Sequence, residues 1–61
     1  MKKILEQIAK YNLYMTSILS VKKNGGLIDL LLDGKWLSTG DTEDIFKRVQ
    51  QINRENGLLL M

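Results

Sequence analysis

Apolar residues recur with helical spacing over the first third of the chain, and they form its longest hydrophobic pattern. They are Ile4, Leu5, Ile8, Tyr11, Tyr14, Met15, Ile18, Leu19 and Val21. At about 100° per residue these positions cover an arc of roughly 200° on one side of a helix, with Leu13 as the exception. Two lysines and Asn24-Gly25 follow, a combination typical of a helix C-terminus. The pattern predicts a helix over residues 2–22.

Residues 13–21 also fit a β-strand. Apolar and polar positions alternate through much of this segment, and its threonine and serines are mediocre helix formers. A strand here would lead into Asn24-Gly25-Gly26 as a hairpin turn. Ile18 breaks the alternation but fits the helical stripe, so the long helix is the favoured interpretation and the strand is the alternative.

The pattern of residues 27–38 predicts a β-hairpin. Two apolar runs flank Asp33-Gly34, and Asp-Gly is a strong signal for a two-residue turn. The matching register pairs Leu32 with Lys35, Leu31 with Trp36, and Leu30 with Leu37. Apolar side chains then occupy both faces of the hairpin, so both faces are expected to contact protein. Trp36 is favoured as a core residue, with an interface anchor as the alternative.

A second helix is predicted over residues 41–56. Asp41 is a good N-cap, and the acidic residues after it suit the positive end of the helix dipole. The apolar stripe covers only about 120°, and it consists of Ile45, Phe46, Val49 and Ile52. Asn56-Gly57 is expected to end the helix, and the apolar tail of residues 58–61 follows.

These elements predict one small α+β domain spanning residues 1–61. The favoured order is helix, β-hairpin, helix (αββα), and a strand within residues 13–21 would give αβββα instead. The second topology resembles that of double-stranded-RNA-binding domains, which place a basic cluster at the start of the last helix. In this chain Asp41, Glu43 and Asp44 stand there, and their charge has the wrong sign for phosphate.

The width of the first apolar stripe predicts self-association. A helix with such a wide arc needs more cover than one hairpin and one short helix provide, and exposed apolar patches mark interfaces. We therefore expect a homodimer in which the same patch of each chain meets its copy. The expected interface residues are Ile4, Leu5, Ile8, Tyr11, Met15, Ile18, Leu19, Trp36, Leu58, Leu59 and Leu60.

The composition argues against an enzyme. The chain has neither cysteine nor histidine, which excludes disulfides and zinc sites of the usual Cys/His type and removes the commonest general base. Asp29 is the one carboxylate between apolar neighbours, and we favour a structural role for it, as an edge charge or through a hydrogen bond to Ser38 or Thr39. We expect no catalytic residue, no cofactor and no metal.

The favoured function is a non-enzymatic protein-binding module that acts as an inhibitor, adaptor or regulator of a larger protein, of the kind that phages and mobile elements encode. The alternative is a small nucleic-acid-binding regulator that uses Lys22, Lys23, Lys35, Trp36, Lys47 and Arg48. The net charge of +2 is weak for a protein that binds phosphate, which favours the protein partner.

The N-terminal residues predict neither export nor membrane insertion. Glu6, Gln7 and Lys10 interrupt the apolar positions that a signal peptide would need. No apolar run approaches the roughly 20 residues of a membrane span. We expect a cytoplasmic protein.

Overall fold

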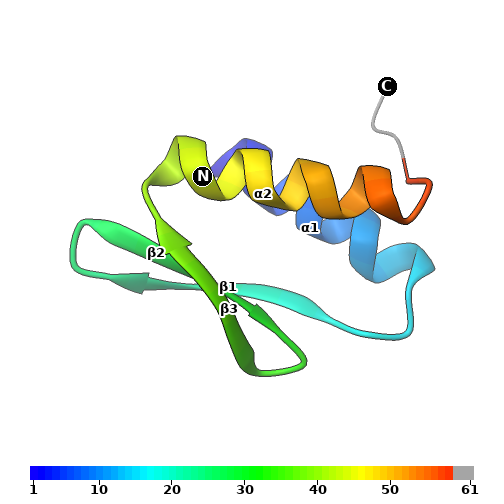
Figure 1. Ribbon diagram of the computed structural model, residues 1–61, viewed down its shortest axis with the longest axis horizontal. Coiled ribbons are helices and arrows are strands. Elements are labelled where there is room, and N and C mark those ends of the chain that lie inside the picture. The colour runs from blue at the N-terminus through cyan, green and yellow to red at the C-terminus, as the bar shows by residue number, and fades with distance from the viewer. Residues whose placement is uncertain (59–61) are drawn as a thin grey trace.

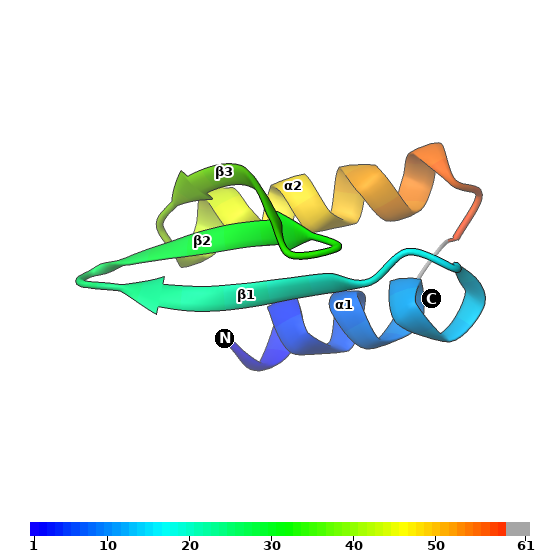
Figure 2. The same ribbon diagram turned by 90° about the horizontal axis from the view of Figure 1, so that it is seen from below.

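The computed structural model describes residues 1–58 and places two helices on one face of a three-stranded antiparallel sheet (Figure 1). The elements are α1 (Lys2–Tyr14), β1 (Leu19–Asn24), β2 (Leu27–Leu32), β3 (Lys35–Gly40) and α2 (Thr42–Glu55). The strand order is β1-β2-β3, with α1 beside β1 and α2 beside β3 (Figure 2). The α+β class is confirmed, and the order is the αβββα alternative.

The favoured helix over residues 2–22 is wrong beyond Tyr14. The Met15 N–H still bonds to the Tyr11 carbonyl, but Met15 itself is extended, with φ −109° and ψ 154°. Residues 19–24 form β1 instead, and they alternate between buried and exposed at its start. The lysines and Asn24-Gly25 therefore belong to a strand and its hairpin turn. Gly25 has φ +64°, a conformation shared by hairpin turns and helix C-termini, which explains the ambiguity of the sequence.

Side-chain hydrogen bonds fix the change from helix to strand. The Asn12 side chain accepts from the Leu19 N–H at 2.8 Å and donates to the Leu19 carbonyl at 3.0 Å. Asp33 makes a similar pair with Ile18, through its carboxylate (2.9 Å) and its own N–H (2.8 Å). These contacts satisfy backbone groups that a continuing helix would have used, so the chain extends after α1.

The hairpin between β2 and β3 is confirmed at its turn. Leu32 pairs with Lys35 around the two-residue turn Asp33-Gly34, in which both residues have positive φ (53° and 80°). That combination is the type I′ turn preferred in hairpins. β3 continues to Gly40, two residues beyond the predicted end of the hairpin.

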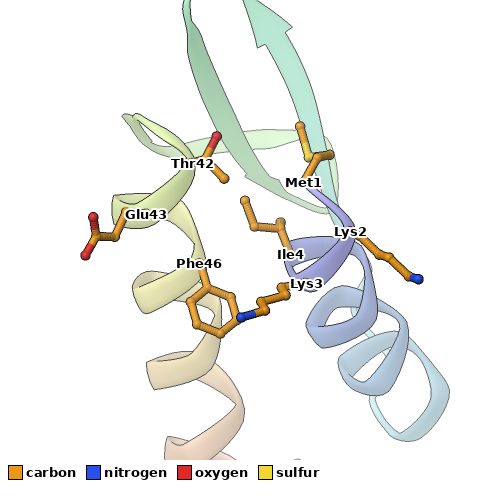
Figure 3. A pocket seen from close by; sticks show the side chains of 7 residues that line it. All are labelled: Met1, Lys2, Lys3, Ile4, Thr42, Glu43 and Phe46. Carbon is orange, nitrogen blue, oxygen red and sulfur yellow. The ribbon is translucent and has the colours of Figure 1, made fainter.

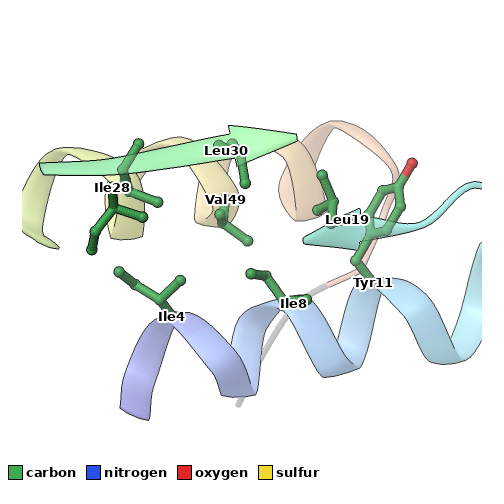
Figure 4. Packing of buried hydrophobic residues seen from close by; sticks show 8 residues of the cluster. Ile4, Ile8, Tyr11, Leu19, Ile28, Leu30 and Val49 are labelled. Atoms are coloured by element: carbon green, nitrogen blue, oxygen red, sulfur yellow. The ribbon is translucent and has the colours of Figure 1, made fainter. Parts of the chain in front are cut away.

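The core lies between the sheet and the two helices (Figure 4). Ile4, Ile8 and Tyr11 of α1 point toward side chains of the sheet and of α2. The buried hydrophobic residues are Ile4, Ile8, Tyr11, Leu19, Ile28, Leu30, Ile45 and Val49. Ile4, Ile8 and Tyr11 of the predicted stripe are thus covered by the same chain, whereas Leu5 remains 50% exposed. β1 supplies Leu19 from the same apolar series.

The second helix begins and ends as the sequence predicts, to within one residue. The Asp41 side chain accepts from the Asp44 N–H at 2.8 Å and caps α2. At the other end Gly57 has φ +74°, and the Leu58 N–H bonds to the Asn53 carbonyl at 2.7 Å. This is the Schellman arrangement, in which an apolar residue after the glycine contacts the helix. Leu58 does pack against the core, and residues 59–61 of the predicted tail lie outside the described residues.

One polar contact joins the two helices inside the core. Asn53 of α2 donates to the backbone carbonyl of Gln7 at 2.9 Å and to its side-chain oxygen at 2.8 Å. Both residues are almost fully buried, at 2% exposure for Gln7 and 1% for Asn53. Among residues 1–58 the Asn53 Oδ1 atom is buried without a partner, but any other alignment of the helices would also leave the two Gln7 oxygens without this donor. The buried pair therefore favours this packing of one helix against the other.

Candidate functional site

The sheet has one face away from the helices, which we call the open face. Its residues follow from the strand register: Ser20, Lys22 and Asn24 of β1, Leu27, Asp29 and Leu31 of β2, and Trp36 and Thr39 of β3. Leu27 and Trp36 are large apolar side chains that remain 46% and 63% exposed. The expected core position of Trp36 is therefore wrong, because the side chain points to the face that no element of residues 1–58 covers.

A β-bulge in β3 determines which residues reach the open face. Leu31 pairs with Trp36 as predicted, but Leu30 pairs with Ser38 and not with Leu37. The extra residue is Leu37, which packs against the core. Because the bulge shifts the alternation by one position, Ser38 turns inward and Thr39 turns outward. Trp36 and Thr39 would lie on opposite faces of a regular strand, and the bulge brings them to the same one.

A chain of two hydrogen bonds links three side chains of the open face. The indole Nε1–H of Trp36 donates to Thr39 Oγ1 at 2.7 Å, and the Thr39 hydroxyl donates to Asp29 Oδ1 at 2.6 Å. A hydrogen bond between Asp29 and Ser38 or Thr39 was expected from the sequence, and the partner is Thr39. The bond from Trp36 fixes the orientation of an exposed aromatic ring, which leaves its faces available while its polar edge is satisfied.

The open face carries two charged residues, Asp29 and Lys22, and both lie near its centre. Asp29 lies on the middle strand, with Lys22 as its cross-strand neighbour on β1. Within residues 1–58 the one ion pair joins Glu43 and Lys47 of α2 at 3.4 Å, so Lys22 does not bond to the Asp29 carboxylate. The face thus combines apolar groups with a fixed carboxylate that lacks a bound cation.

A cavity of about 460 Å³ lies in the helical layer of the fold, between the N-terminal ends of α1 and α2 (Figure 3). Its lining residues are Met1, Lys2, Lys3, Ile4, Thr42, Glu43 and Phe46. The polar lining residues are all exposed, and the charged ones among them, Lys2, Lys3 and Glu43, carry charges of both signs. The cavity offers apolar contact, but no polar side chain is buried in it to select a ligand.

The structure divides the expected interface residues into two groups. Ile4, Ile8, Tyr11 and Leu19 belong to the core of the single chain, so they are not available to a second one. Met15 and Leu58 are partly buried against that core. Leu5, Ile18 and Trp36 are exposed, at 50%, 59% and 63%. Leu59 and Leu60 lie outside the described residues.

The residues expected to bind nucleic acid do not form one strip. Lys22 and Trp36 lie on the open face, whereas Lys23 and Lys35 pair with core-facing residues at opposite ends of β2. Lys47 and Arg48 belong to α2, which packs on the other face of the sheet, and Lys47 is paired with Glu43. The acidic start of α2, where a double-stranded-RNA-binding domain is basic, is also confirmed as a capped helix N-terminus.

Residues 1–58 contain neither a metal-binding cluster nor a membrane-spanning helix. No group of three or more acidic side chains is placed to hold a metal ion. Neither helix in this part of the chain has the length and apolar character needed to cross a membrane.

The open face could be found only in part from the sequence. Its apolar members and Asp29 follow from the alternation of β2, which the hairpin signal places correctly. The bulge left no such signal, because Trp36-Leu37-Ser38-Thr39 also fits a regular strand. Comparisons of the chain with protein-family models, with curated proteins and with solved structures give no match.

Proposed function

We propose that the chain is a non-enzymatic protein-binding module that docks onto a larger protein through its open face, as an inhibitor, adaptor or regulator. The observation that carries the proposal is Trp36, which is 63% exposed although its indole N–H is held by Thr39. Tryptophan is enriched among the residues that dominate binding energy in interfaces. A ring already fixed in the free protein loses little rotamer entropy on binding.

The surroundings of Trp36 support the same function. Leu31 lies beside it on β2 and Leu27 lies further along the same strand, so the apolar surface extends over two strands. Serine, threonine and asparagine side chains surround this surface, as polar residues do at the rim of an interface. A cytoplasmic location is part of the proposal.

The test compares capture of partner proteins by three forms of the tagged chain from an extract of the source organism. Trp36→Ala removes the anchor, and Tyr14→Ala is the matched control because Tyr14 is also 63% exposed but lies at the end of α1. We expect one specific protein to be retained by the wild type and by Tyr14→Ala, and to be lost with Trp36→Ala. Equal retention by all three forms would overturn the proposal.

A salt series separates this function from nucleic-acid binding. Contacts to phosphates release counterions and weaken steeply between low and moderate salt. Binding through Trp36 and the leucines should persist over that range. Retention that disappears with added salt, or after nuclease treatment, would favour the nucleic-acid-binding regulator instead.

We also propose that the chain forms a homodimer, through residues other than those buried in its core. This proposal is supported by three exposed apolar side chains of α1 and the segment after it: Leu5, Leu13 and Ile18. They are separate from the open face, so self-association and binding of a larger protein are compatible.

A further inference from the structure

The centre of the open face holds a carboxylate whose position is fixed. Asp29 lies near the middle of the central strand, and its Oδ1 accepts the hydrogen bond from Thr39 that continues to Trp36. Within residues 1–58 no lysine or arginine is paired with it. A carboxylate beside an aromatic ring combines the two groups that attract a flat cation.

We propose that the open face binds an arginine side chain of the partner protein, with the guanidinium against the Asp29 carboxylate and the Trp36 ring. Arginine suits this place better than lysine, because its planar group stacks on aromatic rings and bonds carboxylates through two N–H groups. Leu27 and Leu31 flank Asp29 on β2 and supply apolar surface for the methylene stem. The inference rests on the proposed function and names the chemistry of the partner.

The same carboxylate argues against two other occupants. A two-fold dimer centred on the open face would place Asp29 opposite the Asp29 of the second copy, and facing like charges are destabilising. A nucleic acid would bring phosphates toward this central negative charge, which also opposes binding. A cationic segment of another protein has the complementary charge.

Lys22 provides a test of whether the bound group is positively or negatively charged. It is the cross-strand neighbour of Asp29, so its ammonium repels a bound guanidinium but would attract a bound anion. Removing its charge with Lys22→Gln should strengthen the binding of a cation and weaken the binding of an anion. Asp29→Asn should do the opposite, while the amide oxygen remains available to Thr39.

The experiment uses the single tryptophan of the chain as a reporter. The full chain, labelled with ¹⁵N, should give one indole N–H signal, and this signal is to be followed during titration with the peptide acetyl-Leu-Arg-Leu-amide at low ionic strength. The peptides acetyl-Leu-Gln-Leu-amide and acetyl-Leu-Glu-Leu-amide are the neutral and acidic probes. We expect a saturable shift of the signal with the arginine peptide, at least about fivefold weaker binding of the glutamine peptide, and weakest binding of the glutamate peptide.

Variants then assign the effect to Asp29. Asp29→Asn should weaken the binding of the arginine peptide about fivefold, and Lys22→Gln should strengthen it about twofold. Glu6→Gln is the control for Asp29→Asn, because it also removes one negative charge but lies on the exposed surface of α1. It should leave the affinity unchanged. Spectra of each variant must retain the dispersed amide signals of the folded chain, which separates a lost contact from a lost fold.

Four results would overturn the inference: no shift of the indole signal with the arginine peptide, equal binding of the glutamine peptide, tighter binding of the glutamate peptide, or no effect of Asp29→Asn. The proposed function fails differently, through capture that does not depend on Trp36. A partner lost with Trp36→Ala but retained by Asp29→Asn would leave the binding module in place and exclude the arginine.

Discussion

The side-chain amide of Asn12 forms two hydrogen bonds with the backbone of Leu19, one to its N–H and one to its carbonyl. Asn12 thereby serves the start of the edge strand β1 as a neighbouring strand would. Leu19 itself is 1% exposed, so these backbone groups have little access to water. The pair therefore determines where the chain leaves α1 and enters the sheet.

Asn12→Ala should lower the free energy of unfolding by about 1–2 kcal/mol, because it leaves two backbone groups without their partners. Asn12→Asp keeps the acceptor for the Leu19 N–H and should cost less than the alanine change. Gln51→Ala, on the exposed surface of α2, is the control and should change stability by less than about 0.5 kcal/mol. Urea unfolding followed by circular dichroism measures all three, and equal stability of Asn12→Ala and the wild type would contradict the assignment.

Asn53→Ala should be more costly, at about 2–3 kcal/mol, since it leaves the side chain of Gln7 buried and unpaired. The double change Gln7→Leu with Asn53→Leu removes both polar groups and should be less destabilising than Asn53→Ala alone. Urea unfolding again supplies the comparison. A double variant that loses more stability than the single one would show that shape, and not hydrogen bonding, dominates at this contact.

The junction between β3 and α2 predicts a contrast between two glycines. A Cβ atom at Gly40 would lie 2.8 Å from the Cβ of Asp44, whereas one at Gly26 would meet nothing within 4 Å. Gly40→Ala should therefore destabilise the fold by about 1–3 kcal/mol through overpacking. Gly26→Ala serves as the control and should stay within about 0.5 kcal/mol of the wild type. Thermal unfolding distinguishes the two, and similar midpoints would contradict the close approach.

Thr39→Val should release the Trp36 ring without unfolding the chain. Valine has nearly the shape of threonine but cannot accept from the indole N–H. We expect the single indole N–H signal to shift and to exchange faster with water, while Thr39→Ser retains the wild-type behaviour. Unchanged exchange in Thr39→Val would show that the hydrogen bond does not hold the ring.

Light scattering on a sizing column tests the homodimer. At micromolar concentration the wild type should have about twice the chain mass of 7.0 kDa. Leu13→Glu places a charge on a side chain that is 73% exposed, so it should reduce the mass to that of one chain and preserve the helical spectrum. Gln51→Glu on α2 should leave the dimer intact. A wild type with the mass of a single chain would exclude the dimer.

The parts of the fold that the sequence predicted correctly are those with local signals. The Asp33-Gly34 turn has the conformation its residues favour, and Asp41 caps α2 as its side chain allows. The end of α1 depends instead on contacts between residues 7 and 15 positions apart, such as those from Asn12 and Asp33. Periodicity carries no information about such contacts, so the apolar series appeared to continue as one helix.

The candidate site shows the same division. The apolar residues of β2 were placed by alternation, but the two faces of β3 depended on one bulge. That bulge leaves the Ser38 hydroxyl oxygen buried without a hydrogen-bond partner among residues 1–58, which a sequence pattern would not favour. The register shift at the bulge places Leu37 against the core and Thr39 beside Asp29. These contacts join residues of different elements, so a sequence pattern does not show them.

The bulge also determines which single-residue deletions in β3 would leave the residues of the open face in place. Deleting Leu37 would turn β3 into a regular strand, yet Trp36 would stay opposite Leu31 and Ser38 would stay opposite Leu30. The loss would fall on the packing of the core, while the pattern of outward side chains would be preserved. In a strand without a bulge, a single deletion turns every later residue to the other face. Deleting Ser38 would have the same effect on the register as deleting Leu37, with Leu37 opposite Leu30 and Thr39 still opposite Asp29. Relatives of this chain should therefore tolerate a missing residue at position 37 or 38 better than at the other positions between the Asp33-Gly34 turn and Gly40.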